Sequence, residues 1–350
     1  MMTAIVCLSL TACEKAPEAD AFVVAEQLGG VSDSGFARAN APREFRFPAD
    51  HGVHPDYRTE WWYVTGNLNS ASGRHFGYQL TLFRVAMTPR APDSPASWAT
   101  NQLWMGHIAL TDVEGGQHYH AERFARGAGG LAGQTDQPFR VWLEDWALTG
   151  TGAADSPWQV KIEDENFALD LQLQNTKPVV LQGDQGLSQK SSEPGNASYY
   201  YSLTRLATAG EVVLDGERLP VSGDSWLDRE WSTSALGPDQ AGWDWFSLQL
   251  KDGRELMYYQ LRKQSGAMDP HSAGKWVDQA GGTQTVKADD VELKPLRYWS
   301  AADGRRYPVK WSLRLPAEGV DWVVEALLDD QLMQTSVTYW EGAVRISEAG

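Results

Sequence analysis

From residue 60 onward, the sequence is a succession of short runs in which apolar and polar residues alternate, separated by Gly, Asn and Asp. Alternation with a period of two is the pattern of a β-strand with one buried face, and clusters of turn residues mark the strand ends. Aromatic residues make up 11% of the chain and favour strands over helices. The sequence therefore predicts an all-β protein. Typical runs are TEWWYVTGNL, RHFGYQLTLFRV, FRVWLEDWALTG and YPVKWSLRLP.

One strand pattern occurs twice in the chain. The two copies keep the same order and, to within two residues, the same spacing: Trp61-Trp62-Tyr63, Gly73-Arg74 and Tyr78 in the first, and Trp243-Asp244-Trp245, Gly253-Arg254 and Tyr258 in the second. Internal repetition of this kind indicates duplicated structural units, and a closed antiparallel barrel leaves no exposed sheet edge. With 350 residues, the chain is long enough for two domains. We predict two tandem antiparallel β-barrel domains, at 46–237 and 238–350.

The charge balance excludes one class of partner. The chain has 30 Lys and Arg against 46 Asp and Glu, which gives a net charge of −16. A charge of this sign repels phosphate backbones. We therefore expect no nucleic-acid partner.

The N-terminal segment predicts export. Residues 1–12 carry no charged side chain, and 10–13 (LTAC) resemble a bacterial lipobox, so we expect 1–13 to be a lipoprotein signal that ends at a lipidated Cys13. A small buried Cys is the alternative. Residues 14–45 lack sustained periodicity and predict a flexible tether. The expected location is the periplasmic side of a membrane, held by the lipid, with the outer membrane favoured because residue 14 is Glu and not Asp.

The segment 223–231 (GDSWLDREW) is the most unusual string in the sequence. In a strand, alternation places Trp226, Asp228 and Glu230 on one face and Arg229 on the other. Two carboxyls in one apolar cavity cannot both ionise cheaply, so one of them would keep its proton near neutral pH and could act as a general acid. The alternative is a structural cluster in which Arg229, or another Arg, pairs with these carboxylates and locks the domain junction.

Two segments place an acid beside indole rings at equivalent points of the copies, 60–63 (EWWY) and 243–245 (WDW). Indole walls suit flat apolar ligands and stabilise a developing carbocation. We expect a ligand cavity here, with Glu60 or Glu230 assisting the acid, and core packing is the alternative for many of the Trp. The expected ligand-binding side chains are Trp61, Trp62, Tyr63, His107, Tyr199, Tyr201, Trp226, Trp243, Asp244 and Trp245.

The histidines do not form a metal-binding motif. His118 and His120 alternate, with His107 on a preceding strand, but no further ligand accompanies them in a recognisable spacing. The sequence also contains no P-loop, no GxGxxG and no GxSxG. We therefore expect no metal and no cofactor. The string 339–342 (YWEG) repeats the Trp-Glu pair, and we interpret it as a closing strand rather than a site.

Several separated segments together resemble one known family. TEWWYVTGNL, SWLDREWS, WDWFSLQLKDGRELMYYQLR and YWEG resemble the family that groups AttH-like periplasmic proteins with carotenoid 1,2-hydratases. The resemblance covers residues 42–350 and implies two lipocalin-like β-barrels, a fold that usually holds an apolar small molecule. In many genomes the AttH-like branch lies beside ABC transporter permeases, so the resemblance also implies an ABC transporter as a partner.

The hydratase branch of this family implies a role for one residue. Its Tyr-x-Asp-x-Asn pattern matches residues 226–230, and its Asp, here Asp228, would protonate an isoprenoid double bond to give a cation that water captures. This sequence has Trp226 and Glu230 in place of Tyr and Asn, and Arg229 follows the aspartate. A neighbouring guanidinium favours the ionised form of Asp228 unless it points to the opposite face.

Three functions remain open from the sequence. The first is a lipid-anchored protein that binds an apolar ligand, a lipid or isoprenoid, for a transporter or a membrane process. The second is a hydro-lyase that protonates an isoprenoid double bond through Asp228. The third is an interaction module with two filled barrels, in which the domain junction is the working surface.

Overall fold

The computed structural model describes residues 34–349, apart from 151–157, 235 and 238. The predicted signal with Cys13, and the predicted tether up to residue 33, lie outside the described residues. Residues 34–45 of the predicted tether pack against the first domain: Ala39 is fully buried, and the ring of Phe45 lies 5.5 Å from that of Trp231.

Thirteen strands of the described chain form one antiparallel sheet. Their spatial order is β4-β3-β2-β1-β13-β12-β9-β8-β7-β6-β5, and β10 and β11 pair with β12. The strands are β1 (Thr59–Ser70), β2 (His75–Ala86), β3 (Gln102–Asp112), β4 (Gln117–Arg126), β5 (Ala132–Asp136), β6 (Phe139–Leu143), β7 (Trp146–Gly150), β8 (Trp158–Glu163), β9 (Phe167–Asn175), β10 (Val180–Leu181), β11 (Leu187–Gln189), β12 (Ala197–Leu214) and β13 (Glu217–Ser232). The short helix η1 (Ala49–His51) precedes β1.

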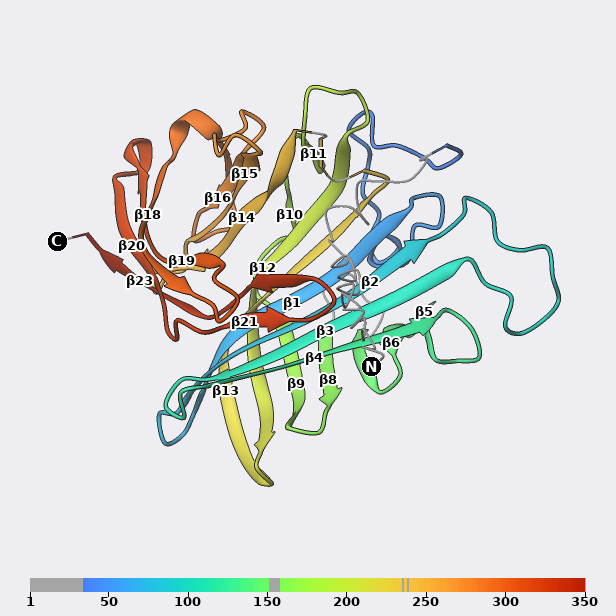
Figure 1. Ribbon diagram of the computed structural model, residues 1–350, viewed down its shortest axis with the longest axis horizontal. Helices are drawn as coiled ribbons and strands as arrows, with labels where there is room; N and C mark the ends of the chain where they lie inside the picture. Colours follow the sequence, from blue (N-terminus) through green and yellow to red (C-terminus); the bar gives the residue numbers. More distant parts are fainter. Residues whose placement is uncertain (1–33, 151–157, 235, 238, 350) are drawn as a thin grey trace, which may run out of the picture.

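This sheet curls into a nearly closed barrel, in which β4 comes close to β6 near the other end of the strand order (Figure 1). The alternating side chains of its strands point inward and form one large apolar core, to which β1, β2, β7, β9 and β12 all contribute. Trp146 and Leu169 are almost completely buried there. The inside of the first barrel is therefore packed with side chains.

The second half of the chain forms two smaller antiparallel sheets and a hairpin. The first sheet contains β14 (Gln240–Gln249), β15 (Glu255–Lys263), β16 (Ala273–Val277) and β17 (Thr283–Lys287). The second contains β18 (Glu292–Ser300), β19 (Arg306–Leu315), β20 (Val320–Ala326) and β23 (Val344–Glu348). The hairpin is β21 (Leu332–Gln334) with β22 (Thr338–Trp340), and the helices are η2 (Ala288–Asp290) and η3 (Pro316–Glu318). Side chains of β14, β15, β19 and β20 meet in a common core.

The repeated sequence pattern forms the same hairpin in both halves. β1 and β2 are joined by a turn in which the Ser70 N–H donates to the Arg74 carbonyl, and the Leu250 N–H donates to the Arg254 carbonyl between β14 and β15. Each turn contains a glycine with φ near +87°, Gly73 or Gly253, in the left-handed region that glycine adopts without strain. The all-β prediction of two tandem lipocalin-like barrels is confirmed.

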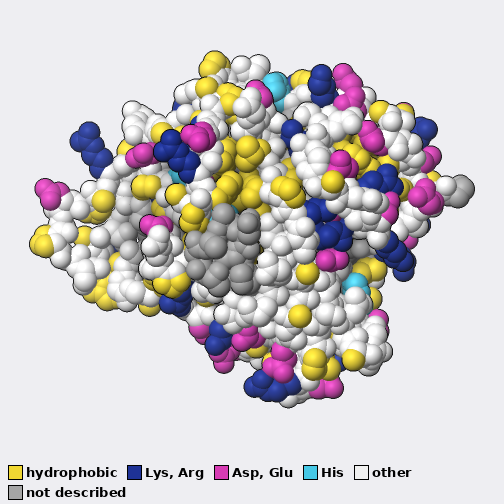
Figure 2. Space-filling model, turned by 180° about the vertical axis from the view of Figure 1, so that it is seen from behind, with side chains coloured by type: hydrophobic (Ala, Val, Ile, Leu, Met, Phe, Trp, Pro, Cys, Tyr) yellow, Lys and Arg dark blue, Asp and Glu magenta, His cyan; other side chains and the backbone are white. Residues whose placement is uncertain are grey.

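The surface shows mixed charge. On the face drawn in Figure 2, basic and acidic side chains are interspersed, and apolar side chains gather near the centre. Within the described part of the chain, no helix has both the length and the apolar character needed to cross a bilayer.

A buried ion cluster joins the two halves. Glu255, on β15, is completely buried, and its carboxylate accepts hydrogen bonds of 2.7 Å from Lys177 Nζ and from Arg205 Nε of the first domain. Arg205 also donates to the Leu250 carbonyl, at 3.0 Å. Ion pairs withdrawn from water are costly to break because the remaining charge stays buried without a partner.

We therefore expect Glu255→Ala to lower the free energy of unfolding by about 3–5 kcal/mol, measured by urea denaturation. The matched control is Glu292→Ala, because Glu292 forms a 2.8 Å pair with Arg314 in which both side chains are close to half exposed. Exposed pairs contribute little, so this variant should change stability by less than about 1 kcal/mol. Equal effects of the two substitutions would contradict an anchoring role for Glu255.

Candidate functional site

A cavity of about 570 Å³ lies between the two domains. One wall is the outer face of β2, β1 and β13, and the other wall comes from β14, β19, β20 and the segment around β22. The hairpin β21–β22 crosses the thirteen-stranded sheet at this junction (Figure 1). The sequence-predicted side chains that line the cavity are Trp61, Tyr63, Trp226, Asp228, Glu230, Trp243, Asp244 and Trp245.

Asp228 is held in this cavity by three hydrogen-bond donors. Its carboxyl accepts from Tyr200 Oη at 2.7 Å, Ser202 Oγ at 2.5 Å and Trp226 Nε1 at 2.7 Å. Burial raises the pKa of Asp228 to about 7, although the three donors act in the opposite direction. The group can therefore give or take a proton near neutral pH.

Arg229 does not pair with Asp228. Because successive residues of a strand point to opposite faces, Asp228 lies in the cavity while Arg229 lies beneath the sheet, against the ring of Trp62 at 3.9 Å. The alternation predicted for residues 226–231 is present in β13, and the alternative in which Arg229 pairs with the cavity carboxylates is wrong. Arg229 instead forms an ion pair with Glu60.

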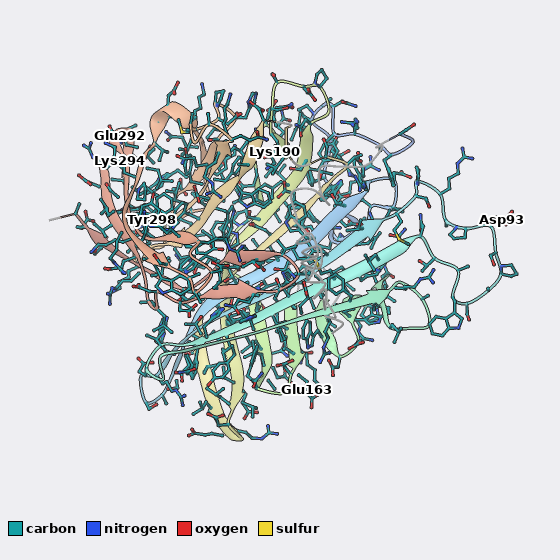
Figure 3. All side chains as sticks on the ribbon, viewed as in Figure 1. Asp93, Glu163, Lys190, Glu292, Lys294 and Tyr298 are labelled. Atoms are coloured by element: carbon teal, nitrogen blue, oxygen red, sulfur yellow. The ribbon has the colours of Figure 1, made fainter. Side chains whose placement is uncertain are left out.

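Glu230 has its own cation. Lys190 Nζ lies 3.2 Å from the Glu230 carboxylate and 4.3 Å from the ring centre of Tyr259, and Ser198 Oγ donates a short hydrogen bond to the same carboxylate. Burial opposes the charge on Lys190, but Glu230 and Tyr259 outweigh it and raise the lysine pKa. Figure 3 shows Lys190 in the upper middle of the view, far from Glu163, which ends β8 in the lower part.

Indole and phenol rings form most of the cavity wall beside Asp228. The ring of Trp245 lies 5.3 Å from that of Tyr63 and 6.5 Å from that of Trp226, edge to face in both cases. Trp245 Nε1 also donates to Tyr200 Oη at 3.3 Å, so the same Trp supports a donor to Asp228. Asp244 pairs with Arg262 at 3.5 Å, and burial raises its pKa against that pairing.

Glu341 is a cavity residue that the sequence interpretation missed. The string 339–342 was expected to close the fold, but β22 ends at Trp340 and Glu341 lines the cavity. Its carboxyl accepts a 2.7 Å hydrogen bond from Tyr63 Oη. Burial raises the pKa of Glu341 to about 7, against the effect of Tyr63. A glutamate beside a tryptophan occurs both at 60–61 (Glu-Trp) and at 340–341 (Trp-Glu), but adjacent residue types alone do not show which way a side chain points.

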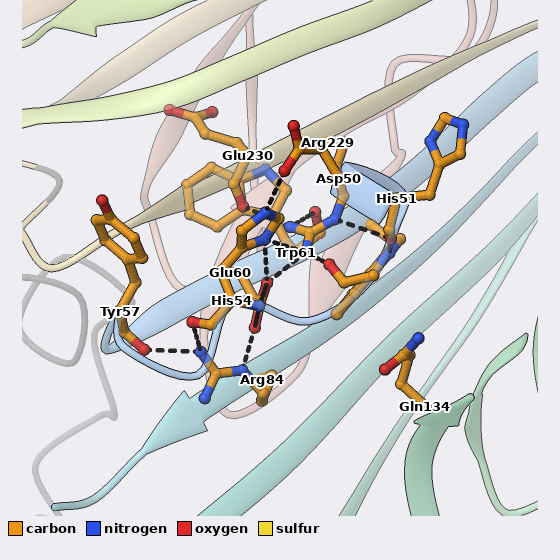
Figure 4. A network of polar contacts seen from close by, with 12 residues as sticks. Asp50, His51, His54, Tyr57, Glu60, Trp61, Arg84, Gln134, Arg229 and Glu230 are labelled. Atoms are coloured by element: carbon orange, nitrogen blue, oxygen red, sulfur yellow. Dashed lines mark hydrogen bonds and ion pairs between the residues drawn. The ribbon is translucent and has the colours of Figure 1, made fainter. Parts of the chain in front are cut away.

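Glu60 lies on the opposite side of the sheet from the cavity. It is completely buried and forms short ion pairs with Arg84 and Arg229 (Figure 4). The two guanidinium groups outweigh the effect of burial and hold the pKa of Glu60 well below its usual range. A carboxylate that stays ionised and paired is unsuited to donating a proton, so its predicted assisting role has no geometric support.

Three other predicted ligand-binding residues lie in the first domain's core instead of the cavity wall. Trp62 Nε1 donates to the His51 carbonyl at 2.8 Å, Tyr199 Oη donates to the Ala41 carbonyl at 2.8 Å, and Tyr201 Oη lies 2.6 Å from His51 Nδ1. All three rings belong to the core of the first barrel. Alternation along the strand explains the position of Trp62, because it lies between two residues that face the cavity, Trp61 and Tyr63.

His107 is buried between a cavity residue and an acid. Its Nδ1 lies 2.9 Å from Tyr339 Oη, and its Nε2 lies 2.8 Å from Glu122. It therefore supports Tyr339, which does line the cavity. Across the described residues, no group of three or more His, Cys, Asp or Glu side chains is placed to hold a metal ion.

These features define a class: a tandem lipocalin-like protein with a cavity between its barrels. A family model described as AttH-like matches residues 38–350, so the chain belongs to the AttH-like family. The crystal structure of an AttH from Nitrosomonas europaea is similar, with 35% identity, 89% of this chain and 95% of that chain covered, and a TM-score of 0.78. Kievitone hydratase from Nectria haematococca shares the fold, with 15% identity, 89% and 93% coverage, and a TM-score of 0.62. No curated protein matches the chain significantly.

The Glu60 network leads to a prediction for stability. Glu60→Gln leaves two buried guanidinium groups without their shared carboxylate, so we expect a loss of about 3–5 kcal/mol in the free energy of unfolding near pH 7. Because the folded state lowers the pKa of Glu60, its contribution is present above about pH 4.5, the ordinary value, and is lost as the pH falls below it.

Denaturation of both proteins at pH 7 and pH 3.5 tests this. The gap between wild type and Glu60→Gln should narrow at the lower pH, while Asp93→Asn, in an exposed loop, should match the wild type at both. A gap that stays constant or widens on acidification would contradict the assigned ion pairs.

Proposed function

We propose that this protein binds an apolar small molecule, a lipid or an isoprenoid, in the cavity between its two domains. The observation that carries this proposal is the cavity itself, about 570 Å³ and lined by the rings of Trp61, Tyr63, Trp226, Trp243 and Trp245. Ligand sites of proteins typically have volumes of about 300–1,000 Å³, largely apolar walls and a few directed polar groups. The carboxyls of Asp228 and Glu341 supply such polar groups here.

The proposed cellular setting rests on the sequence. We propose that the chain is exported, lipidated at Cys13 and held on the periplasmic side of a membrane, with the outer membrane favoured. In this setting the bound ligand would pass to or from an ABC transport system. The lipobox-like string 10–13 and the resemblance to the AttH-like branch support this setting.

Binding is tested with N-phenyl-1-naphthylamine, an apolar dye whose fluorescence rises out of water. A protein that starts at residue 34 should bind the dye. Trp245→Ala should weaken this binding about tenfold, because the substitution removes part of the cavity wall. The control is Trp98→Ala, since Trp98 is 58% exposed on the loop after β2. Dye binding unaffected by Trp245→Ala, or equally weakened by Trp98→Ala, would place the apolar site elsewhere.

A second candidate function is acid catalysis on an unsaturated apolar substrate. The specific observation is Asp228, a buried carboxyl with a pKa of about 7 among aromatic rings that can stabilise a cation. The fold shared with kievitone hydratase is compatible with this chemistry, although fold alone does not determine function. In this reaction Asp228 would protonate a double bond, and water would add to the cation.

This candidate is tested with kievitone, squalene and lycopene as separate probes, followed by mass spectrometry for the addition of one water. If the protein hydrates a probe, Asp228→Asn should lower the rate by about 100-fold or more, because the Asn amide is too weak an acid to protonate a double bond. Ser222→Ala is the control, since Ser222 lies on the same strand outside the cavity lining. Full activity of Asp228→Asn would remove the catalytic candidate and leave the binding function.

A further inference from the structure

We propose that Glu341 is a second proton-transferring residue of the cavity: it accepts a proton from the attacking water while Asp228 gives one to the substrate carbon. This inference rests on the second candidate function, acid catalysis at Asp228. It extends that function from one acid to an acid and a base supplied by different domains.

The two carboxyls come from opposite walls, and Tyr63 lies beside Asp228 in the sheet and donates a hydrogen bond to Glu341. Tyr63 on β1 is the ladder partner of Asp228 on β13, so the two side chains leave the sheet on the same face. Tyr63 Oη reaches across and donates to Glu341, which follows β22 in the C-terminal domain. Asp228 and Glu341 thus face the same cavity. The phenol of Tyr63 lies between strand β13, which carries Asp228, and the carboxyl of Glu341.

Ion pairing separates the cavity carboxyls into two kinds. Glu230 is paired with Lys190, and Asp244 is paired with Arg262. Among the described residues, neither Asp228 nor Glu341 forms an ion pair with a Lys, Arg or His side chain; their recorded partners are neutral donors. Without a fixed cation, no nearby positive charge stabilises the ionised form of Asp228 or Glu341, so these two groups can exchange protons at a moderate pH.

Glu341 is not needed to hold its own segment in place. Residues 331–343, which we name the strap, are fixed to the first domain at several other points. Thr111 Oγ1 donates to Gln331 at 2.8 Å, Ser336 Oγ donates to Glu122 at 2.6 Å, and His107 Nδ1 lies 2.9 Å from Tyr339 Oη. Holding a carboxyl partly out of water costs free energy in such a position, and the strap's anchors do not require one.

The O–H proton of neutral Asp228 forms a new C–H bond with one alkene carbon, the π electrons are used in that bond, and the other carbon becomes a cation. A water oxygen forms the C–O bond, and one of its protons passes to the Glu341 carboxylate. Asp228 ends as a carboxylate and Glu341 as an acid, and solvent returns both to their starting states. The product is the alkene plus one water, with no oxidation or reduction.

Two isotopes separate the roles of the two carboxyls. Each probe of the preceding section is incubated with full-length protein in deuterium oxide and, separately, in water labelled with oxygen-18. Asp228 controls deuterium entry at carbon, and Glu341 controls entry of the labelled oxygen. In Glu341→Gln we expect oxygen incorporation to fall about 100-fold, while deuterium exchange stays within about threefold, because the cation still forms and returns its proton.

Two further variants distinguish proton transfer from a structural effect. Glu341→Asp keeps a carboxyl and should recover at least about a tenth of the oxygen incorporation. Ser336→Ala removes one strap contact outside the cavity lining and should retain both isotope signals. Thermal unfolding of each variant reports whether it is folded.

The outcomes fall into distinct cases. Wild type that incorporates neither isotope into any probe overturns acid catalysis and the role of Glu341 together, and leaves only binding. Wild type that incorporates both, with Glu341→Gln unchanged or with both signals lost equally, overturns the role of Glu341 alone. Loss of oxygen incorporation with retained deuterium exchange supports the proposal, as does its recovery in Glu341→Asp.

Discussion

The buried ion network of Glu60 with Arg84 and Arg229 is the interaction on which the site depends. Strand β13 carries a cation and an acid at adjacent positions, and the network holds that cation on the inner side of the sheet. Asp228 on the outer side is therefore surrounded by neutral donors and rings. If Arg229 lay in the cavity, its charge would keep the acid ionised. A structural ion cluster on one face thus permits a protonated carboxyl on the other.

The same sheet separates core from cavity. The inward side chains of the first barrel fill its interior, whereas the outward side chains of β1, β2 and β13 include large aromatic rings. Such a face is too apolar to leave in water, and the C-terminal domain covers it. The cover leaves a cavity of about 570 Å³ between the two domains. The strap completes one wall of the cavity and contributes Glu341, which lies outside the thirteen-stranded sheet.

Sequence patterns predicted much of this arrangement. The period of two predicts the strands, the repeated hairpin and the two faces of 226–231. The same rule explains why the predicted placement of Trp62 in the cavity wall is wrong. Trp62 alternates with Trp61 and Tyr63 along the strand, so the three side chains cannot all face one cavity. Residue type alone does not distinguish a Trp in the core from a Trp in the cavity wall, so composition could not assign the aromatic residues to one or the other. The pairing of Glu60 with two arginines depended on neighbours that local patterns do not reveal.

The sequence by itself determined the all-β class, the duplication and which residues of β13 share a face, because these follow from local periodicity in one strand. Only the tertiary structure decided that the cavity lies between the barrels and that Glu341 contacts Tyr63, 278 positions earlier in the chain. It also decided which cavity carboxyls have a cation and which do not. The physical reason is that burial and charge pairing arise from segments distant in sequence, and these two quantities set whether a carboxyl holds a proton.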